Sequence, residues 1–187
     1  MNKRKSKGKK IRPTFFVFCE GKTEEAYIKY LRSTYRLPIE VDPKIAGNRI
    51  TDKYISEYKK QKTVHLKDKT FLIYDYDIES LLHKLQQIKN TYLLYSNPCF
   101  EFWYLLHCQD QKTSLTSKEC ISKLKIHIKK YKKGVFDDKL KNKIIERKSK
   151  SISRAKALPE FCNPSTNVYK LIEELDAIKN DCFEIKI

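Results

Sequence analysis

The apolar positions of this 187-residue chain fall into two alternating patterns along its first half. Continuous apolar runs occur at TFFVFCE (14–20), FLIYDYD (71–77) and TYLLYS (91–96), and a fourth run, LPIEVDPKI (37–45), contains two prolines. Continuous apolar runs are typical of strands buried on both faces, whereas prolines favour the edge of a sheet. The pattern therefore predicts four strands, and the strand at 37–45 is expected at an edge.

Between these runs, apolar residues recur every three or four positions, which predicts amphipathic helices. The three apolar stripes are Ala26, Tyr27, Tyr30 and Leu31; Ile50, Tyr54, Ile55 and Tyr58; and Ile78, Leu81, Leu82, Leu85 and Ile88. The resulting order, βαβαβαβ, predicts an α/β fold in which about four mainly parallel strands are flanked by helices.

From residue 97 the pattern is helical. FEFWYLLH comes first, and Thr116 and Glu119 form a T-x-x-E capping box at the start of the next helix. A lysine-rich segment covers about 129–150, and the last helix has Ser165 or Thr166 as its expected N-cap. We expect a basic flexible arm (1–12), an α/β core (13–96) and a helical C-terminal part (97–187) packed on it as one compact domain.

The charge of the chain is its most unusual property. Lys and Arg number 40 against 23 Asp and Glu, which gives a formal net charge of +17. Such an excess implies a polyanionic partner, either nucleic acid or an acidic membrane surface. No apolar run approaches the roughly 20 residues of a spanning helix, and no signal peptide follows the first lysines, so we expect a soluble, cytoplasmic protein without a membrane partner.

Residues 1–12 carry seven basic residues and no acidic one. Such an arm favours contacts with phosphates, although a purely solubilising tail has the same composition. The six cysteines are scattered without C-x-x-C spacing, and the four histidines lie far apart. These spacings argue against a zinc site and against a disulfide framework.

Carboxylates stand at the ends of two predicted strands. Glu20 ends the first, and Asp75 and Asp77 end the third. In a parallel α/β sheet, ligands bind outside the carboxyl ends of the strands, and clustered carboxylates need a cation to remain ionised together. A divalent metal such as Mg²⁺ would satisfy them. Individually, each has a simpler reading: Asp77 could cap a helix at Ile78, Asp75 could lie in a turn, and Glu20 could pair with Lys22.

These residues also resemble a known family. A strand ending in Glu, a G-x-T-E-E helix start and a later D-x-D are the pattern of the Toprim domain, and the whole chain resembles the RloB-like family. The resemblance rests on FCEGKTEEAYIKYL, YDYD, SNPCFEFWYLLH, SRAKAL and NPSTNVYKLIEEL, in that order, and covers about residues 12–176. It implies a Toprim-like α/β fold.

The resemblance also implies roles for single residues. Glu20, Asp75 and Asp77 would bind Mg²⁺ or Mn²⁺ and act in catalysis, with Glu101 as a further acidic member. Phosphate-binding candidates are Lys22, Asn97, Arg154 and Lys156. Each has a structural alternative. Lys22 could be an exposed lysine at a helix start, and Asn97 and Glu101 could belong to an N-P turn followed by a helix with core spacing. Arg154 and Lys156 could be ordinary charges on a helix surface. Glu79 extends the acidic ladder but equally suits a helix N-terminus.

The implied activity is Mg²⁺-dependent cleavage of nucleic-acid phosphodiester bonds. The substrate would be tRNA or another RNA, or DNA, because the charge alone does not distinguish them. The resemblance associates the chain with phage defence and abortive infection and with a partner ATPase encoded nearby. A homo-oligomer is a further option for the chain. Two other hypotheses remain open: a nucleic-acid-binding or regulatory subunit with a degenerate site, and a purely structural basic protein.

Overall fold

The computed structural model describes residues 12–37, 39–76 and 79–184. One sheet has the strand order β2-β1-β3-β4-β5. Its strands are β1 (Thr14–Cys19), β2 (Glu40–Ile45), β3 (Lys69–Asp75), β4 (Tyr92–Asn97) and β5 (Ser165–Thr166). The first four are parallel to one another, and β5 pairs with β4 in the antiparallel direction. The predicted mainly parallel sheet is confirmed, and so is the edge position of β2.

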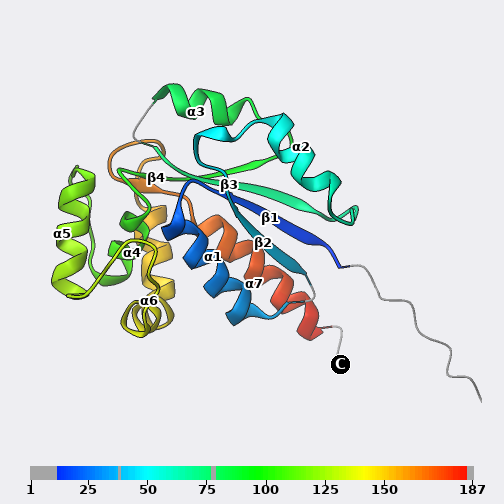
Figure 1. Ribbon diagram of the computed structural model, residues 1–187. Coiled ribbons are helices and arrows are strands. Elements are labelled where there is room, and N and C mark those ends of the chain that lie inside the picture. Colours follow the sequence, from blue (N-terminus) through cyan, green and yellow to red (C-terminus); the bar gives the residue numbers. More distant parts are fainter. Residues whose placement is uncertain (1–11, 38, 77–78, 185–187) are drawn as a thin grey trace, which may run out of the picture.

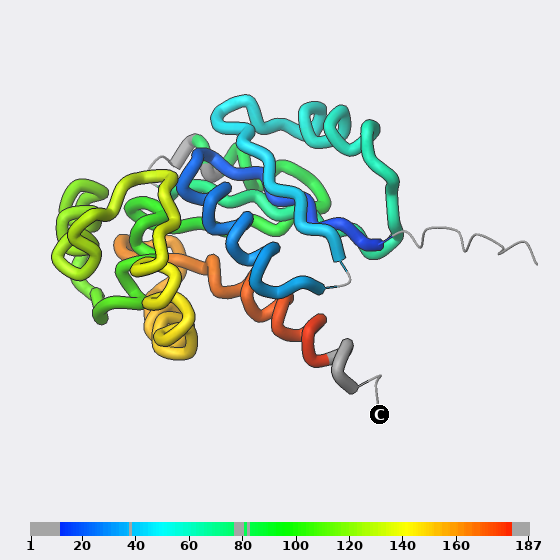
Figure 2. The backbone as a smooth tube through the Cα atoms, turned by 60° about the horizontal axis from the view of Figure 1, so that its bottom comes forward, coloured from blue at the N-terminus to red at the C-terminus, as the bar shows by residue number. Residues whose placement is uncertain are grey.

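Helices cover both faces of this sheet (Figure 1). On one face lie the 3₁₀ helix η1 (Gly47–Arg49), α2 (Asp52–Lys60) and α3 (Glu79–Gln86). The other face carries α1 (Lys22–Tyr35), α4 (Glu101–Cys108), α5 (Ser117–His127), α6 (Asp138–Lys156) and α7 (Tyr169–Glu184). In Figure 2, α1 and α7 run side by side beneath the strands, while α4, α5 and α6 gather at one end. The larger apolar core lies on the α1 and α4 side.

Successive side chains of a strand point to opposite faces of the sheet, so alternate residues belong to the two apolar cores on either side of it. In β1, Phe15, Val17 and Cys19 belong to the larger core, whereas Phe16 and Phe18 belong to the core under α2 and α3. In β3, Phe71 and Ile73 take the larger core. Side chains two apart on a strand share a face, so Asp75 points to the side of α1 and α4. None of the helices that the structure describes is long and apolar enough to cross a membrane.

The predicted N-terminus of the last helix is wrong. Ser165 and Thr166 do not cap α7; they form β5, and the helix begins at Tyr169. Side-chain bonds hold this segment against β4 instead: Thr166 Oγ1 lies 2.8 Å from Ser96 Oγ and donates to the Tyr95 carbonyl at 3.0 Å. The capping box of Thr116 and Glu119 is confirmed, with both of its bonds formed.

Asn167 fixes the C-terminal part to β4, and its replacement by alanine should destabilise the fold. Its side chain accepts from Tyr95 N at 2.7 Å and donates to the Leu93 carbonyl at 3.0 Å. Truncation would remove the side-chain partner of both backbone groups, at a cost of about 2 kcal/mol. We expect the melting temperature to fall by about 4–8 °C in thermal unfolding, given the size of the chain.

The matched control is Asn142→Ala, since Asn142 is an exposed asparagine on α6. Its removal should leave the melting temperature unchanged within about 2 °C, because surface substitutions have small effects. Equal melting temperatures for the two variants would show that the bonds of Asn167 contribute nothing.

Candidate metal-binding active site

Two neighbouring strand ends bring the first carboxylates together. β1 and β3 lie side by side with Cys19 opposite Ile73, so the residues that follow meet at the same edge. Glu20 N donates to the Ile73 carbonyl at 3.0 Å. Asp75 N in turn donates to Glu20 Oε2 at 2.9 Å. The predicted meeting of Glu20 and Asp75 at the carboxyl edge is therefore present in the structure.

Two helices add carboxylates from above this edge. Glu24 lies in the first turn of α1 and is 6% exposed, and its Oε2 accepts a bond from Gly21 N at 3.1 Å. Glu101 is the first residue of α4 and is 1% exposed. A carboxylate at a helix N-terminus is favoured by the helix dipole, which offsets part of the cost of burial. We call Glu20, Glu24, Asp75 and Glu101 the acidic cluster.

The members of the acidic cluster act on one another electrostatically. Burial raises the pKa of Asp75 to about 9, and Glu20, Glu24 and Glu101 add to the rise. Burial likewise raises the pKa of Glu24 to about 7, together with the charges of Glu101 and Glu20. Both carboxyl groups would be ionised at neutral pH in water, so burial and the neighbouring carboxylates disfavour their charged forms in the folded protein.

A polar network fixes Glu101. Its Oε1 accepts from Tyr131 Oη at 2.8 Å and from Thr23 Oγ1 at 3.4 Å, and its Oε2 lies 3.7 Å from Lys133 Nζ. Gly134 N donates to Thr23 Oγ1 at 3.1 Å, which binds the segment between α5 and α6 to the start of α1. Two separate stretches of the chain, the start of α1 and the segment between α5 and α6, thus contact the Glu101 carboxylate of α4.

Gly134 allows this convergence for a steric reason. Its φ is +74°, in the left-handed region that favours glycine, and a Cβ at this position would lie 3.0 Å from the Lys22 Cβ. A side chain here would strain the backbone and push the segment away from α1. The position of Lys133 beside the acidic cluster therefore depends on Gly134.

Lys133 is the cation of the site. Its side chain is 60% exposed although its partner Glu101 is buried. Burial of Lys133 works against its charge, but Glu101, and further Asp75 and Glu24, raise its pKa above the ordinary lysine value. The ammonium group therefore stays charged and lies between solvent and the acidic cluster.

The donor chemistry of the cluster fits a hard divalent metal. Oδ1 of Asp75 is buried and has no hydrogen-bond partner among the residues that the structure describes. An isolated buried carboxylate oxygen is costly unless a cation or donor reaches it. Within the described ranges, which omit Asp77, no three His, Cys, Asp or Glu side chains are grouped so as to hold a metal ion. Asp77, predicted as a ligand, lies outside the described residues. Glu79 begins α3, beyond the end of β3.

The other predicted site residues are distributed as follows. Lys22 is exposed at the start of α1, and Asn97 ends β4 at the edge of a cavity. Arg154 Nη1 donates to the Leu106 carbonyl at 2.6 Å, and Lys156 forms an ion pair with Glu173 at 2.6 Å. The last two are engaged in contacts of the helical part, and no contact in the described structure joins them to the acidic cluster.

Sequence reasoning missed Glu24, Tyr131 and Lys133. Glu24 had a signal, because it follows Glu20 by four residues within the quoted G-x-T-E-E motif. Tyr131 and Lys133 had none, since a single lysine among 40 basic residues cannot be distinguished by spacing.

The solved structure found to be similar is the C-terminal region of the Burkholderia pseudomallei OLD protein. The identity is 13%, the similarity covers 91% of this chain and 98% of that one, and the TM-score is 0.37, so we draw no functional conclusion from it. No curated protein matches the sequence significantly. The family model described as RloB-like protein matches residues 15–175. The chain therefore belongs to the RloB-like protein family.

Proposed function

We propose that this protein is a Toprim-type, Mg²⁺- or Mn²⁺-dependent nuclease that cleaves phosphodiester bonds of nucleic acid. The observation that carries the proposal is Asp75, a strand-end carboxylate whose buried Oδ1 has no hydrogen-bond partner within the described ranges and whose pKa is raised by burial and by Glu20, Glu24 and Glu101. Strongly perturbed carboxyl groups at the carboxyl edge of a parallel sheet are typical of catalytic sites. The net charge of +17 suits a polyanionic substrate.

Glu20 and Asp75, with Asp77 as the resemblance implies, would hold the metal. A bound divalent ion would polarise the scissile phosphate and stabilise negative charge in the transition state. Glu24 would lie beside these ligands and raise the local negative charge that attracts the cation. The positive charge of the bound ion would offset the repulsion between the neighbouring carboxylates and favour their ionised forms.

The basic side chains around the acidic cluster would bind the substrate. Lys133, held by Glu101 and exposed to solvent, can donate to a phosphate oxygen while its charge offsets the neighbouring carboxylates. Lys22 is exposed next to it, on the helix that Gly134 contacts. Glu101 would act as a positioning residue for Lys133 and not as a metal ligand, because its Oε1 is already occupied by Tyr131 and Thr23.

The resemblance supports a role in the cell as well. We propose that the protein acts in the cytoplasm as the effector of a phage-defence or abortive-infection system, on tRNA, other RNA or DNA, under the control of a partner ATPase. In this arrangement the ATPase would determine when the nuclease gains access to its substrate.

The test is cleavage of a panel of tRNA, single-stranded RNA and DNA, with Mg²⁺ or Mn²⁺ and with EDTA. We expect cleavage only with metal, and about a 10- to 100-fold lower rate for Glu24→Gln, since it removes one charge beside the metal ligands. Glu25→Gln is the matched control on the same helix, because Glu25 forms a surface ion pair with Lys29 at 2.8 Å. Its rate should change less than about twofold.

Cleavage that persists in EDTA would refute the proposal. If the wild type binds nucleic acid without cutting it, both alone and with the partner ATPase, the protein would instead be a non-catalytic binding subunit.

A further inference from the structure

A cavity opens beside the acidic cluster, and it differs in character from the rest of this basic protein. Its volume is about 550 Å³. Among the residues that the structure describes, nine line it: Tyr76, Asn97, Pro98, Ser114, Leu115, Thr116, Ser117, Glu119 and Asn163. None of the nine is Lys or Arg, although the chain has 40 of them. The described lining offers no cationic side chain to pair with a phosphate, and its amide, hydroxyl and aromatic groups suit an uncharged polar group.

The backbone connects the cavity directly to the acidic cluster. Tyr76 follows Asp75, and its N–H donates to the Ser96 carbonyl at 2.8 Å, while Asp75 lies opposite Ser96 in the sheet. Asn97 comes next on β4 and stands four residues before Glu101. A ligand in the cavity would therefore lie beside whatever group the acidic cluster engages.

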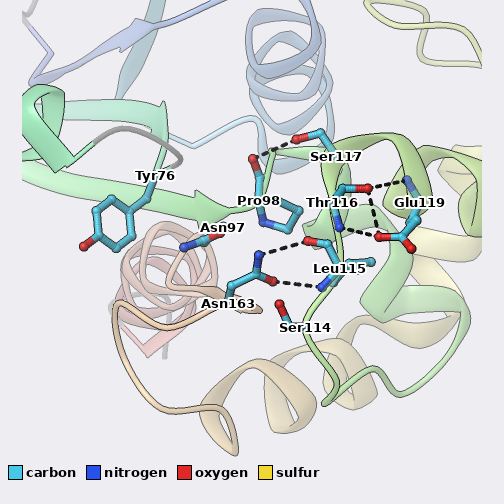
Figure 3. Close-up of a pocket in the computed structure, with 9 residues that line it drawn as sticks. All are labelled: Tyr76, Asn97, Pro98, Ser114, Leu115, Thr116, Ser117, Glu119 and Asn163. Atoms are coloured by element: carbon cyan, nitrogen blue, oxygen red, sulfur yellow. Dashed lines mark hydrogen bonds between the residues drawn. The ribbon is translucent and has the colours of Figure 1, made fainter.

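The walls combine an aromatic ring with free amide and hydroxyl groups (Figure 3). The side chains of Tyr76, Asn97 and Ser114 form no hydrogen bond or ion pair within the described residues. Figure 3 shows Tyr76 at one side of the cavity and the stretch from Ser114 to Glu119 at the other. Asn97 can both donate and accept hydrogen bonds through its amide, as the edge of a nucleobase requires.

The opposite wall is held rigidly. Asn163 accepts from Leu115 N at 3.1 Å and donates to the Leu115 carbonyl at 2.9 Å. The Glu119 carboxylate accepts hydrogen bonds from the N–H and the hydroxyl of Thr116 in the capping box, so it already has partners within the protein. Ser117 Oγ donates to the Pro98 carbonyl at 3.2 Å. These bonds shape the cavity before any ligand arrives, which lowers the ordering cost of binding.

No described aromatic residue stacks parallel on the ring of Tyr76. Tyr95 and Phe161 meet it at 76° and 90°, with centroids 6.0 and 5.8 Å away. Tyr95 and Phe161 stack on each other instead, at 4.6 Å. Tyr76 is half-buried and Phe161 is 40% exposed, so this aromatic group borders solvent at the mouth of the site. Nucleobases stack on such rings without regard to sequence.

We propose that this cavity binds one unpaired nucleobase of the substrate, next to the phosphate that the acidic cluster attacks. The inference rests on the proposed nuclease function and specifies its substrate class: a single-stranded or looped nucleic acid, since a base paired in a duplex cannot enter. Tyr76 provides the stacking surface, and Asn97 and Ser114 contact the edge of the base. The cavity therefore selects unpaired nucleotides.

The test measures binding in EDTA, so that it does not depend on cleavage. The probe is a single-stranded oligonucleotide of about ten nucleotides with one 2-aminopurine, whose fluorescence falls on stacking. We expect quenching with the wild type, about tenfold weaker binding for Tyr76→Ala, and binding within about twofold of wild type for Tyr76→Phe. Ser114→Ala, at an exposed position, is a second variant that should keep the fold and weaken binding about twofold to fivefold.

The matched control is Tyr92→Ala, because Tyr92 is a 51% exposed tyrosine at the opposite end of β4. Its binding should equal that of the wild type. The same oligonucleotide without the base at that position should bind about tenfold more weakly, and a duplex should not quench. If the abasic oligonucleotide binds as tightly as the oligonucleotide with the base, then the cavity does not bind the base, and the inference is overturned. Quenching in EDTA, together with no cleavage in the separate assay with Mg²⁺ or Mn²⁺ and the partner ATPase, would refute the nuclease and leave the base site standing.

Discussion

Replacing Asp75 by asparagine should abolish cleavage and at the same time stabilise the metal-free protein at alkaline pH. We expect the rate to fall by about 10³-fold or more, because a metal ligand that carries charge would be lost. The isosteric amide cannot repel Glu20, Glu24 or Glu101, whose charges raise the pKa of Asp75. One substitution should therefore separate function from stability.

The raised pKa of Asp75 determines the pH range in which Asp75→Asn is more stable than the wild type. The pKa of Asp75 is raised from 3.8 to about 9 in the folded protein. The stability associated with its neutral form is fully present below about pH 4 and is lost as the pH rises toward 9. Asparagine is neutral throughout, so Asp75→Asn should match the wild type at pH 4 and exceed it at pH 9.

Thermal unfolding in EDTA at several pH values measures this effect. We expect Asp75→Asn to melt about 4–8 °C above the wild type at pH 9, corresponding to about 2 kcal/mol for a chain of this size. Mg²⁺ or Mn²⁺ should stabilise the wild type and not the variant, since only the wild type binds the metal. Asp138→Asn, at an exposed position of α6, is the control and should show neither change.

Two results would contradict this account of Asp75. Cleavage by Asp75→Asn at the wild-type rate would exclude the acidic cluster as the active site. A lower melting temperature for the variant at pH 9 would show that the carboxylate has a stabilising partner and that its charge is not a cost.

The carboxyl edge of the sheet could be predicted from sequence because its causes are local. Apolar runs mark β1 and β3, and parallel pairing brings Glu20 and Asp75 to the same edge. The family assignment, confirmed over residues 15–175, rested likewise on short contiguous blocks. Alternation places Asp75 on the same face of β3 as Phe71 and Ile73, but both faces of this strand are buried, so the helices on that face had to come from the structure.

The remainder of the site could not be predicted, because it depends on contacts between distant residues. Gly134 bonds Thr23 across 111 positions, and Tyr131 reaches Glu101 across 30. No periodicity links such residues. β5 was missed for a related reason: two residues are too short a run to indicate a strand, and Thr166 joins the sheet through side-chain bonds to β4.

Removal of the cation of the site should be nearly as damaging as removal of a metal ligand. We expect Lys133→Ala to lower kcat by about 10²-fold with little change in KM, because a donor aimed at charge that develops in the transition state contributes mainly there. The neighbouring Lys132 is exposed and forms no ion pair in the described structure, so Lys132→Ala should lose less than about twofold. Lys133→Arg keeps the charge and should recover part of the rate.

The pH profile distinguishes this role from simple attraction of nucleic acid. Asp75 and Glu24 raise the pKa of Lys133, so the charge of Lys133 must favour the ionised forms of these two carboxyl groups by the same interaction energies. Without that charge, Asp75 and Glu24 ionise at higher pH, and the acidic limb of the kcat profile should move upward. A lysine that only attracts the polyanion would instead raise KM and reduce the salt dependence of binding, with the pH profile unchanged. A Lys133→Ala variant with that second behaviour would place Lys133 on the binding surface and outside the catalytic machinery.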